Sequence, residues 1–302
     1  MTTEWSKPSL FDPITPLPTR AAPARATVSV SCVDPCLCCN AAVRMAGKSV
    51  VITGATGIAA ASARRLGSEG AGLFVISRHQ AELEDLAARL EQDGVDIGWY
   101  PADLTDEGET GEAFAKALDH LGNFDALLGV AGASGRRYGD GPADEMTLEA
   151  WEKTVSINLS PAFLAAREAI RVMRGGRGGS IVLVGSVLAD HPSPDLFATH
   201  AYAASKGAIS AFVTAAAAYY APDGIRINGI APGLVLTPMA RRAATNPAIV
   251  AYAERKQPLA SGLLDPSAVA DAALFLLSDE ASQITGQILA VDGGWSVTEA
   301  HT

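Results

Sequence analysis

A tyrosine and a lysine, Tyr202 and Lys206, stand four residues apart at the start of an alanine-rich run that continues to Ala221. On a helix this spacing puts both side chains on one face, so a phenol and an ammonium can reach the same reacting group. We expect the ammonium to favour the tyrosinate and to lower the pKa of Tyr202 from about 10 toward neutral pH. The pair suggests a proton-transfer catalyst, although the spacing alone is more often that of a solvated helix face, and the rest of the chain must decide.

A glycine turn follows the first apolar run of the domain and leads directly into a helical stretch. Glycines at 54 and 57 permit a tight turn and let a pyrophosphate approach the backbone N–H groups at the helix N-terminus. A glycine pair is weak evidence alone, but its place between a first strand and a first helix favours dinucleotide binding over a plain structural turn. The predicted cofactor contacts here are Thr53, Gly54, Thr56, Gly57 and Ile58.

The end of the second expected strand indicates which dinucleotide is bound. About twenty residues after such a turn, a carboxylate normally holds the adenosine ribose of NAD. This chain has Ser77 and Arg78 there, and a guanidinium can pair with a 2′-phosphate. We therefore predict NADP(H) as the preferred cofactor, with NAD(H) as the alternative. Asp103 and Leu104, after the third expected strand, are predicted to contact the adenine, although Asp103 fits a cap of the next helix equally well.

Short apolar runs alternate with helical stretches from Ser49 onward, and no internal repeat competes with this pattern. Near-continuous apolar strands separated by helices are typical of a parallel sheet covered on both faces. We predict a single α/β domain over residues 45–302, with a doubly wound, Rossmann-type parallel sheet in three α/β/α layers. The expected strands are residues 50–53, 73–77, 97–102, 126–131, 180–185, 226–231 and 287–291, and the expected helices are 58–69, 80–92, 107–121, 147–173, 202–221 and 266–278.

The composition restricts the class of partner. The chain has 302 residues, 48% of them hydrophobic, and a formal net charge of −10. Binding to a nucleic-acid backbone needs clustered Lys and Arg, so we expect no nucleic-acid partner. No apolar run is long enough for a membrane span and no secretory signal is recognisable, so we expect a cytoplasmic protein without a membrane partner.

Residues 1–44 are rich in proline and show no sustained periodicity, which indicates a flexible N-terminal extension. Met45 stands directly before the first expected strand, so translation could start there, with a tail of residues 1–44 as the alternative. All four cysteines lie in the extension, so the main domain has no cysteine for a disulfide or for nucleophilic catalysis. We expect no metal site. Structural zinc usually draws two ligand pairs separated by a longer loop, so we interpret this crowded cluster as incidental. The four residues are Cys32, Cys36, Cys38 and Cys39.

With these residues assembled, the chain resembles the short-chain dehydrogenase/reductase family over roughly Lys48 to Val297. One motif would be weak evidence, but an ordered set is specific. The set is the glycine turn, Asp103, Ala131-Gly132, Asn158, Ser186, Tyr202 with Lys206, Pro232-Gly233 with Thr237, and Val291-Asp292-Gly293-Gly294.

The resemblance implies a role for each of four residues. Tyr202 would be the general acid or base, and Lys206 would hold the nicotinamide ribose and lower the phenol pKa. Ser186 would hydrogen-bond the substrate oxygen, and Asn158 would fix a water relay to Lys206. From the residues alone, Ser186 fits a turn cap and Asn158 a satisfied mid-helix polar group equally well. The resemblance adds Ala131, Gly132, Pro232, Gly233, Val235 and Thr237, with Tyr202 and Lys206 themselves, to the predicted cofactor contacts.

Departures from the family pattern concern the turn and the substrate loops. Two residues separate Gly54 from Gly57, one fewer than is common, and Ala60 replaces a third glycine. The link from Ser186 to Tyr202 is about three residues longer than usual. We expect loops 133–146, 187–200 and 234–262 to form the walls of the substrate pocket. Four arginines there could meet an anionic substrate or simply face solvent: Arg136, Arg137, Arg241 and Arg242.

The resemblance implies an oxidoreductase that interconverts a carbonyl and an alcohol, foremost an NADPH-dependent reductase of a ketone or a 3-oxoacyl thioester. An alternative is oxidation of a sugar or secondary alcohol. A protein that binds a dinucleotide as a sensor or scaffold, without turnover, is the alternative from another class. The family commonly pairs subunits through two long helices, so we expect a homodimer or homotetramer assembled through residues 147–173 and 202–221.

Overall fold

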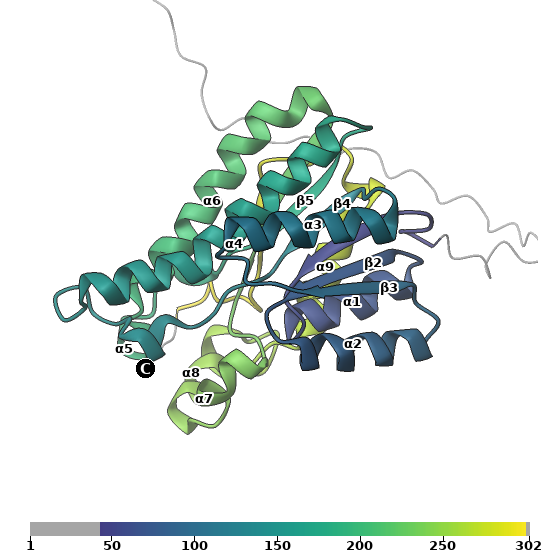
Figure 1. Cartoon of the computed structure of the whole chain (residues 1–302). Helices are drawn as coiled ribbons and strands as arrows, with labels where there is room; N and C mark the ends of the chain where they lie inside the picture. The colour runs from purple at the N-terminus through teal and green to yellow at the C-terminus, as the bar shows by residue number, and fades with distance from the viewer. Residues whose placement is uncertain (1–42, 300–302) are drawn as a thin grey trace, which may run out of the picture. The chain divides into compact units, whose positions relative to one another are not determined.

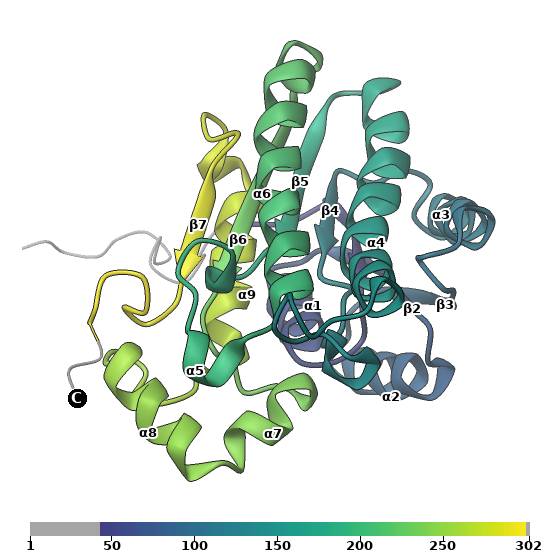
Figure 2. The same cartoon turned by 90° about the vertical axis from the view of Figure 1, so that its left-hand side faces the viewer.

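The computed structural model describes residues 43–299, which Figures 1 and 2 show from two directions. The cysteine cluster and most of the expected extension lie outside the described residues. Arg44, which the sequence assigned to the extension, belongs to the folded unit because its backbone N–H donates to Glu69 Oε2 at 3.0 Å. Met45 is fully buried in the core.

Seven parallel strands form one sheet in the order β3-β2-β1-β4-β5-β6-β7. The order reverses between β1 and β4, so the sheet is doubly wound as predicted. The strands are β1 Ser49–Thr53, β2 Gly72–Ser77, β3 Ile97–Pro101, β4 Ala126–Gly129, β5 Gly179–Val184, β6 Ile225–Pro232 and β7 Ile288–Val291.

Helices cover both faces of the sheet. On one face lie α1 (Ile58–Ser68), α2 (Gln80–Gln92) and α9 (Pro266–Leu277), and on the other α3 (Glu107–Leu121), α4 (Leu148–Arg174) and α6 (His200–Tyr220). Three shorter helices lie in the loops after β5 and β6: α5 Pro194–Phe197, α7 Arg241–Ala244 and α8 Pro247–Lys256. The predicted three-layer α/β/α fold is confirmed.

The strand sequences explain the two cores. Successive side chains of a strand point to opposite faces, and here both faces are buried. In β1, Val50 and Ile52 belong to the core under α1, α2 and α9, whereas Val51 belongs to the core under α3, α4 and α6. The long apolar runs in the sequence therefore reflect burial on both sides.

The expected boundaries hold to within one residue, except for two-residue differences at the end of the fourth strand and at the start of one helix. β4 ends at Gly129, not at Ala131, because the N–H groups of Val130 and Ala131 donate to Thr53 Oγ1 at 3.0 and 3.1 Å. That hydroxyl takes the place of a neighbouring strand and turns the chain out of the sheet. The helix that carries Tyr202 begins two residues early, at His200.

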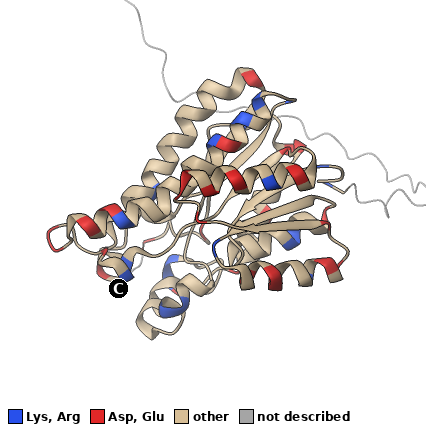
Figure 3. Cartoon of the chain, viewed as in Figure 1, with Lys and Arg blue, Asp and Glu red and all other residues tan. Residues whose placement is uncertain are grey.

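Charged residues are spread over the helices, and acidic residues are prominent along α2 and α3 (Figure 3). In the described part of the chain, Arg226 is the single charged residue of the strands. Its guanidinium donates to the carbonyl oxygens of Leu276 and Ser278 at 2.8 and 3.0 Å, where α9 ends. A cation is favourable there because these carbonyls lack helical partners.

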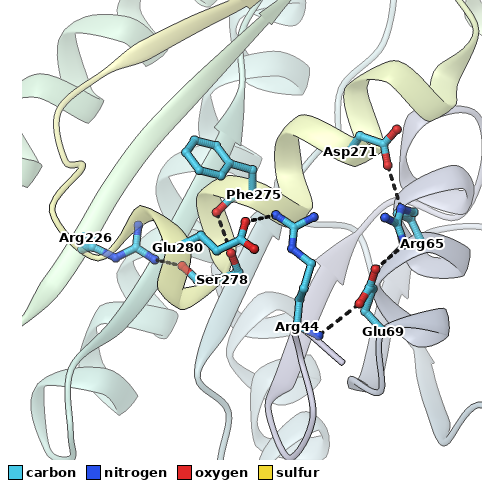
Figure 4. A network of polar contacts seen from close by, with 8 residues as sticks. All are labelled: Arg44, Arg65, Glu69, Arg226, Asp271, Phe275, Ser278 and Glu280. Atoms are coloured by element: carbon cyan, nitrogen blue, oxygen red, sulfur yellow. Dashed lines mark hydrogen bonds and ion pairs between the residues drawn. The ribbon is translucent and has the colours of Figure 1, made fainter. Parts of the chain in front are cut away.

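Exposed ion pairs on the same side of the unit add less stability. Arg65 of α1 bridges Glu69 and Asp271 at 2.6 Å each, and Arg44 pairs with Glu280 (Figure 4). Exposed pairs of this kind contribute about 0–1 kcal/mol. Hydrogen bonds from a charged donor to less exposed carbonyls contribute about 1.5–3 kcal/mol, so Arg226 does more than these pairs to hold α9 against the sheet.

Candidate active site

A cavity of about 590 Å³ opens at the carboxyl ends of the strands, where doubly wound sheets bind ligands. It lies at the reversal of strand order between β1 and β4. The sequence-predicted residues that line it are Gly54, Thr56, Gly57, Ile58, Ser77, Arg78, Asp103, Leu104, Ala131, Gly132, Asn158, Ser186, Tyr202, Lys206, Pro232, Gly233, Val235 and Thr237.

Thr53 is the exception among the predicted site residues. It is buried and not part of the cavity lining, because its hydroxyl accepts from the two backbone N–H groups that follow β4. Thr53 thus shapes the cavity wall through the loop after β4 and has no side chain at its surface.

The glycine turn forms a cradle at the N-terminus of α1. Gly57 has a φ of +56°, and a Cβ at this position would lie 2.8 Å from Thr237 Cγ2. The N–H of Ala59 donates to the carbonyl of Thr56 at 3.1 Å, but no side chain of the described residues caps α1, and the N–H of Ile58 stays available at the positive end of the helix dipole. The turn therefore fits the pyrophosphate of a dinucleotide despite its short spacing.

Tyr202 lies in the first turn of α6, and a buried carboxylate fixes its backbone. Asp140 Oδ1 accepts from the N–H of Ala201 at 3.0 Å, and its Oδ2 accepts from the N–H of Tyr202 at 3.1 Å. Asp140 therefore caps α6 from a loop about sixty residues earlier. Sequence reasoning missed Asp140, because no local pattern in its own loop marks a contact this distant.

The environment of the Tyr202 phenol differs from the sequence-based expectation. Burial raises the pKa of Tyr202 to about 12, and the neighbouring Ser186 hydroxyl only partly opposes this shift. The predicted lowering by Lys206 is therefore wrong for the protein alone. The Lys206 ammonium lies 5.7 Å from the centre of the tyrosine ring, where desolvation of the phenol outweighs its attraction.

Lys206 is 4% exposed, and its Nζ donates to the carbonyl of Val184 at the end of β5, at 2.8 Å. Burial lowers its pKa from 10.5 to about 8. Gly132 leaves room beside it, because a Cβ there would lie 3.6 Å from Lys206 Nζ and 2.8 Å from Asn158 Oδ1. Because Gly132 has no side chain, the Lys206 ammonium and the Asn158 amide can both lie close to the backbone at this position.

Asn158 is fully buried in the middle of α4 and joins that helix to the loop after β4. Its Nδ2 donates to the carbonyls of Ala133 and Thr154 at 2.9 Å each, and its Oδ1 accepts from the N–H of Ala133 at 3.1 Å. Its polar atoms are thus satisfied by backbone, as the structural alternative predicted. A water relay through Asn158 stays a prediction.

Arg78, Ser77 and Asp103 lie together at the end of the cavity formed by β2 and β3. Arg78 Nη1 is 4.0 Å from Asp103 Oδ2, and Asp103 Oδ1 accepts from the backbone and hydroxyl of Thr105. Although burial opposes it, these contacts lower the pKa of Asp103. The alternative of Asp103 as a helix cap is wrong, because Asp106 caps α3.

Comparison with known proteins gives the family. A family model described as Enoyl-(Acyl carrier protein) reductase matches residues 52–296. A 2,5-dichloro-2,5-cyclohexadiene-1,4-diol dehydrogenase from Sphingobium indicum is 34% identical over 255 residues, covering 84% of this chain and 98% of that protein. The chain belongs to the short-chain dehydrogenase/reductase family.

Two further comparisons agree with this assignment. The cis-4-hydroxycyclohexanecarboxylate dehydrogenase of Sinomonas cyclohexanicum is 35% identical over 253 residues, which are 83% of this chain and 97% of that protein. The structure of a short-chain type dehydrogenase/reductase from Mycobacterium ulcerans is similar with a TM-score of 0.78 and 29% identity, covering 84% of this chain and 92% of that chain. This member of the family is an oxidoreductase that acts on CH–OH or carbonyl groups with NAD(P).

The substrate end of this short-chain dehydrogenase/reductase is enclosed by apolar side chains that include Leu188, Phe197 and Trp295. Trp295 is almost fully buried, donates from Nε1 to the carbonyl of His191 at 3.1 Å, and packs edge-on against Phe197. Asp292 accepts from the N–H groups of Gly294 and Ser296, which shapes the turn that carries Trp295. The Asp-Gly-Gly motif was recognised, but the tryptophan after it was not.

Gln257 is a third residue that the sequence did not reveal. It is fully buried, and its Nε2 donates to the carbonyls of Leu234 and Gly262 at 3.1 and 2.7 Å. Its Oε1 accepts from the N–H of Leu234. One amide thus joins both ends of the loop after β6, which contains the ordered helices α7 and α8.

Residues 43–299 are the part of the chain that the structure describes. Within that range no group of three or more His, Cys, Asp or Glu side chains is arranged to hold a metal ion. None of the helices described there combines the length and apolarity needed to cross a bilayer.

The Lys206 environment predicts a pH-dependent stability. The unfolded chain holds the Lys206 proton up to about pH 10.5 and the folded chain only to about pH 8. Raising the pH between these values therefore stabilises the folded state. In urea unfolding without added cofactor, the free energy of unfolding of the wild type should rise relative to Lys206→Met by on the order of 2 kcal/mol between pH 7.5 and 9.5. A difference between the two proteins that does not change with pH would contradict the burial argument.

Proposed function

We propose that this protein interconverts a secondary alcohol and its ketone, with Tyr202 as the general acid or base. The observation that carries the proposal is the meeting of the Tyr202 phenol, the Ser186 hydroxyl and the Lys206 ammonium in one cavity with a dinucleotide cradle. A phenol and a hydroxyl facing one cavity can share a substrate oxygen, which a plain binding protein does not need.

The cradle fits NAD(P) for two reasons. One part of the cavity is enclosed by the glycine turn, the N-terminus of α1 and Thr237, and another part is lined by Lys206. In this proposal, the N–H groups of α1 hold the pyrophosphate, and Lys206 holds the nicotinamide ribose. When bound, the cofactor supplies or accepts the hydride at its nicotinamide ring.

In reduction, Ser186 donates a hydrogen bond to the carbonyl oxygen, and Tyr202 gives that oxygen its phenolic proton as negative charge develops. A raised pKa suits this step, because the phenol remains protonated through neutral pH. In oxidation the phenolate must take the proton from the alcohol. The rate of oxidation should therefore rise with pH, as a larger fraction of Tyr202 becomes ionised.

For the substrate we propose a secondary alcohol on an alicyclic ring, oxidised to the ketone. Two relatives, at 34% and 35% identity, are named as dehydrogenases of a cyclohexadiene diol and of a hydroxycyclohexanecarboxylate. The apolar residues Leu188, Phe197 and Trp295 in the cavity lining suit a ring of that size. This support favours the secondary-alcohol dehydrogenase over a 3-oxoacyl reductase, which is the second candidate. The description of the matching family model shares the acyl class of substrate with that candidate, but it names an enoyl group and not a 3-oxoacyl group.

Removing the phenolic hydroxyl tests the proposed chemistry. Tyr202→Phe should lower kcat by at least about a hundredfold on a panel of cyclohexanols, hydroxycyclohexanecarboxylates and their ketones, assayed with both cofactors. The matched control is Tyr219→Phe, an exposed tyrosine of the same helix, which should retain wild-type rates. A fully active Tyr202→Phe would rule out the acid–base role, and a wild type that turns over no alcohol or carbonyl would favour the sensor or scaffold.

We further propose that NADP(H) is preferred to NAD(H). The support is Arg78, a half-exposed guanidinium at the adenosine end, beside Ser77 where NAD-specific sites carry a carboxylate. Glu82, in the first turn of α2, also lines this end and opposes a 2′-phosphate. Arg78 follows β2 directly, at the position where residues of this fold contact the adenosine ribose. We therefore give the charge of Arg78 greater weight than that of Glu82.

Arg78→Gln should raise the KM for NADP(H) at least about tenfold and leave the KM for NAD(H) little changed, because only the 2′-phosphate loses a charged partner. Arg89→Gln removes an equivalent charge from the exposed face of α2 and should change neither value. Steady-state kinetics with both cofactors give the result. Equal effects of Arg78→Gln on the two cofactors would show that this guanidinium does not select between them.

We propose a cytoplasmic homodimer or homotetramer that pairs through α4 and α6. Leu159, Phe163 and Phe212 line a shallow apolar depression shared by these helices, and Phe163 is 44% exposed in the single chain. The Phe163 and Phe212 rings pack edge-on at 6.1 Å. A second copy would cover this surface and exclude water from it.

Introducing a charge into this depression tests the assembly. Phe163→Glu should yield a monomer in light scattering coupled to size-exclusion chromatography, since a buried carboxylate without a partner opposes association. Leu259→Glu, at an exposed leucine of the loop after β6, should retain the wild-type mass. A monomeric wild type would refute the proposal.

A further inference from the structure

Arginines gather at the substrate end of the cavity from two elements that are far apart in the sequence. Arg136 and Arg137 belong to the short helix η2 (Gly135–Tyr138), and Arg242 belongs to α7. All three line the cavity, whereas Arg241 does not. Arg137 is exposed and lies 4.7 Å over the ring of Tyr138, so Arg136 and Arg242 are the pair to explain.

Arg136 is held in place on the substrate side. Its Nη2 donates to the carbonyl of Leu196 in α5, at 3.1 Å, and the next residue, Phe197, lines the substrate end. A guanidinium has five N–H donors in a planar fork. One bond therefore fixes its orientation and leaves donors for a ligand that can accept two hydrogen bonds at once.

The charges around Arg136 are unusual for a structural arginine. Within residues 43–299, neither Arg136 nor Arg242 forms an ion pair with a carboxylate. Burial and the nearby Arg242 both lower the pKa of Arg136, and Asp140 opposes this shift. Both carboxylate oxygens of Asp140 accept from the backbone of α6 and do not bind the guanidinium. Arg136 and Arg242 repel one another, and this repulsion costs free energy when no anion lies between them. A bound anion would offset that cost.

We propose that Arg136, together with Arg242, binds a carboxylate carried by the substrate, so that the substrate is a cyclic hydroxy acid or the corresponding keto acid. This inference rests on the proposed function, because it places the reacting carbon at Tyr202 in the same cavity. Asp140 links the proposed catalytic residue to the proposed carboxylate site. It binds the backbone N–H of Tyr202 and lies close to Arg136.

The competing assignment is that the two arginines bind a phosphate of the cofactor. Arg136 is tethered to Leu196 of α5, next to Phe197 in the cavity lining, and makes no hydrogen bond to the glycine turn in the described residues, which supports the substrate. Binding measured on protein that is already saturated with cofactor separates the two assignments.

The test uses the full chain saturated with NADP(H), or with NAD(H) if that binds more tightly, and isothermal titration with two probes of equal size. Cyclohexanecarboxylate should bind at least about tenfold more tightly than cyclohexanecarboxamide, because only the acid forms charge-assisted bonds with the guanidinium. Arg136→Gln should abolish this preference. Arg242→Gln, whose guanidinium donates no hydrogen bond among the described residues, should reduce it without disturbing α5. Arg89→Gln is the charge-matched control and should retain it.

Three outcomes would overturn the proposal: equal binding of acid and amide, no binding of either, or a preference that survives in both Arg136→Gln and Arg242→Gln. A loss of cofactor affinity in these variants, with the acid preference intact, would assign the arginines to the cofactor instead. The binding assay does not depend on turnover. An acid preference in an active Tyr202→Phe would therefore refute the proposed chemistry and support the carboxylate site.

Discussion

The burial of a lysine ammonium is the constraint on which the site depends. Lys206 is almost completely shielded from water, and the Val184 carbonyl at the end of β5 is its hydrogen-bond acceptor in the described residues. Such burial costs free energy and lowers the lysine pKa. It is tolerated because the carbonyl of Val184, the last residue of β5, accepts a hydrogen bond from the ammonium, and because Gly132 carries no side chain that would fill the space.

Long-range hydrogen bonds give the cavity its rigidity. Asp140 holds the start of α6, Asn158 holds the loop after β4, and Gln257 closes the loop after β6. In each case a buried side chain satisfies backbone groups of a distant segment, and the loss of one partner would leave the other unsatisfied. The walls of the cavity are loops, but their positions are set by the same packed interior as the sheet.

The fold was predictable because its signals are local. Apolar runs such as that of β1 and the glycine turn depend on neighbours in the sequence, and the expected strand and helix boundaries hold within two residues. The fourth strand is the informative error. Its last residues look like strand, but the Thr53 hydroxyl, from another part of the chain, ends the pairing.

The sequence by itself determined the fold class, the family resemblance and the set of residues that the cavity brings together. These follow from periodicity and from an ordered series of motifs, both of which one chain carries in full. The tertiary structure alone decided how those residues are charged and held. Burial sets the pKa values of Tyr202 and Lys206, and only folding brings Asp140 to α6 or Arg136 to Arg242. Desolvation and contacts between distant segments are properties of the packed chain, and no local sequence pattern encodes them.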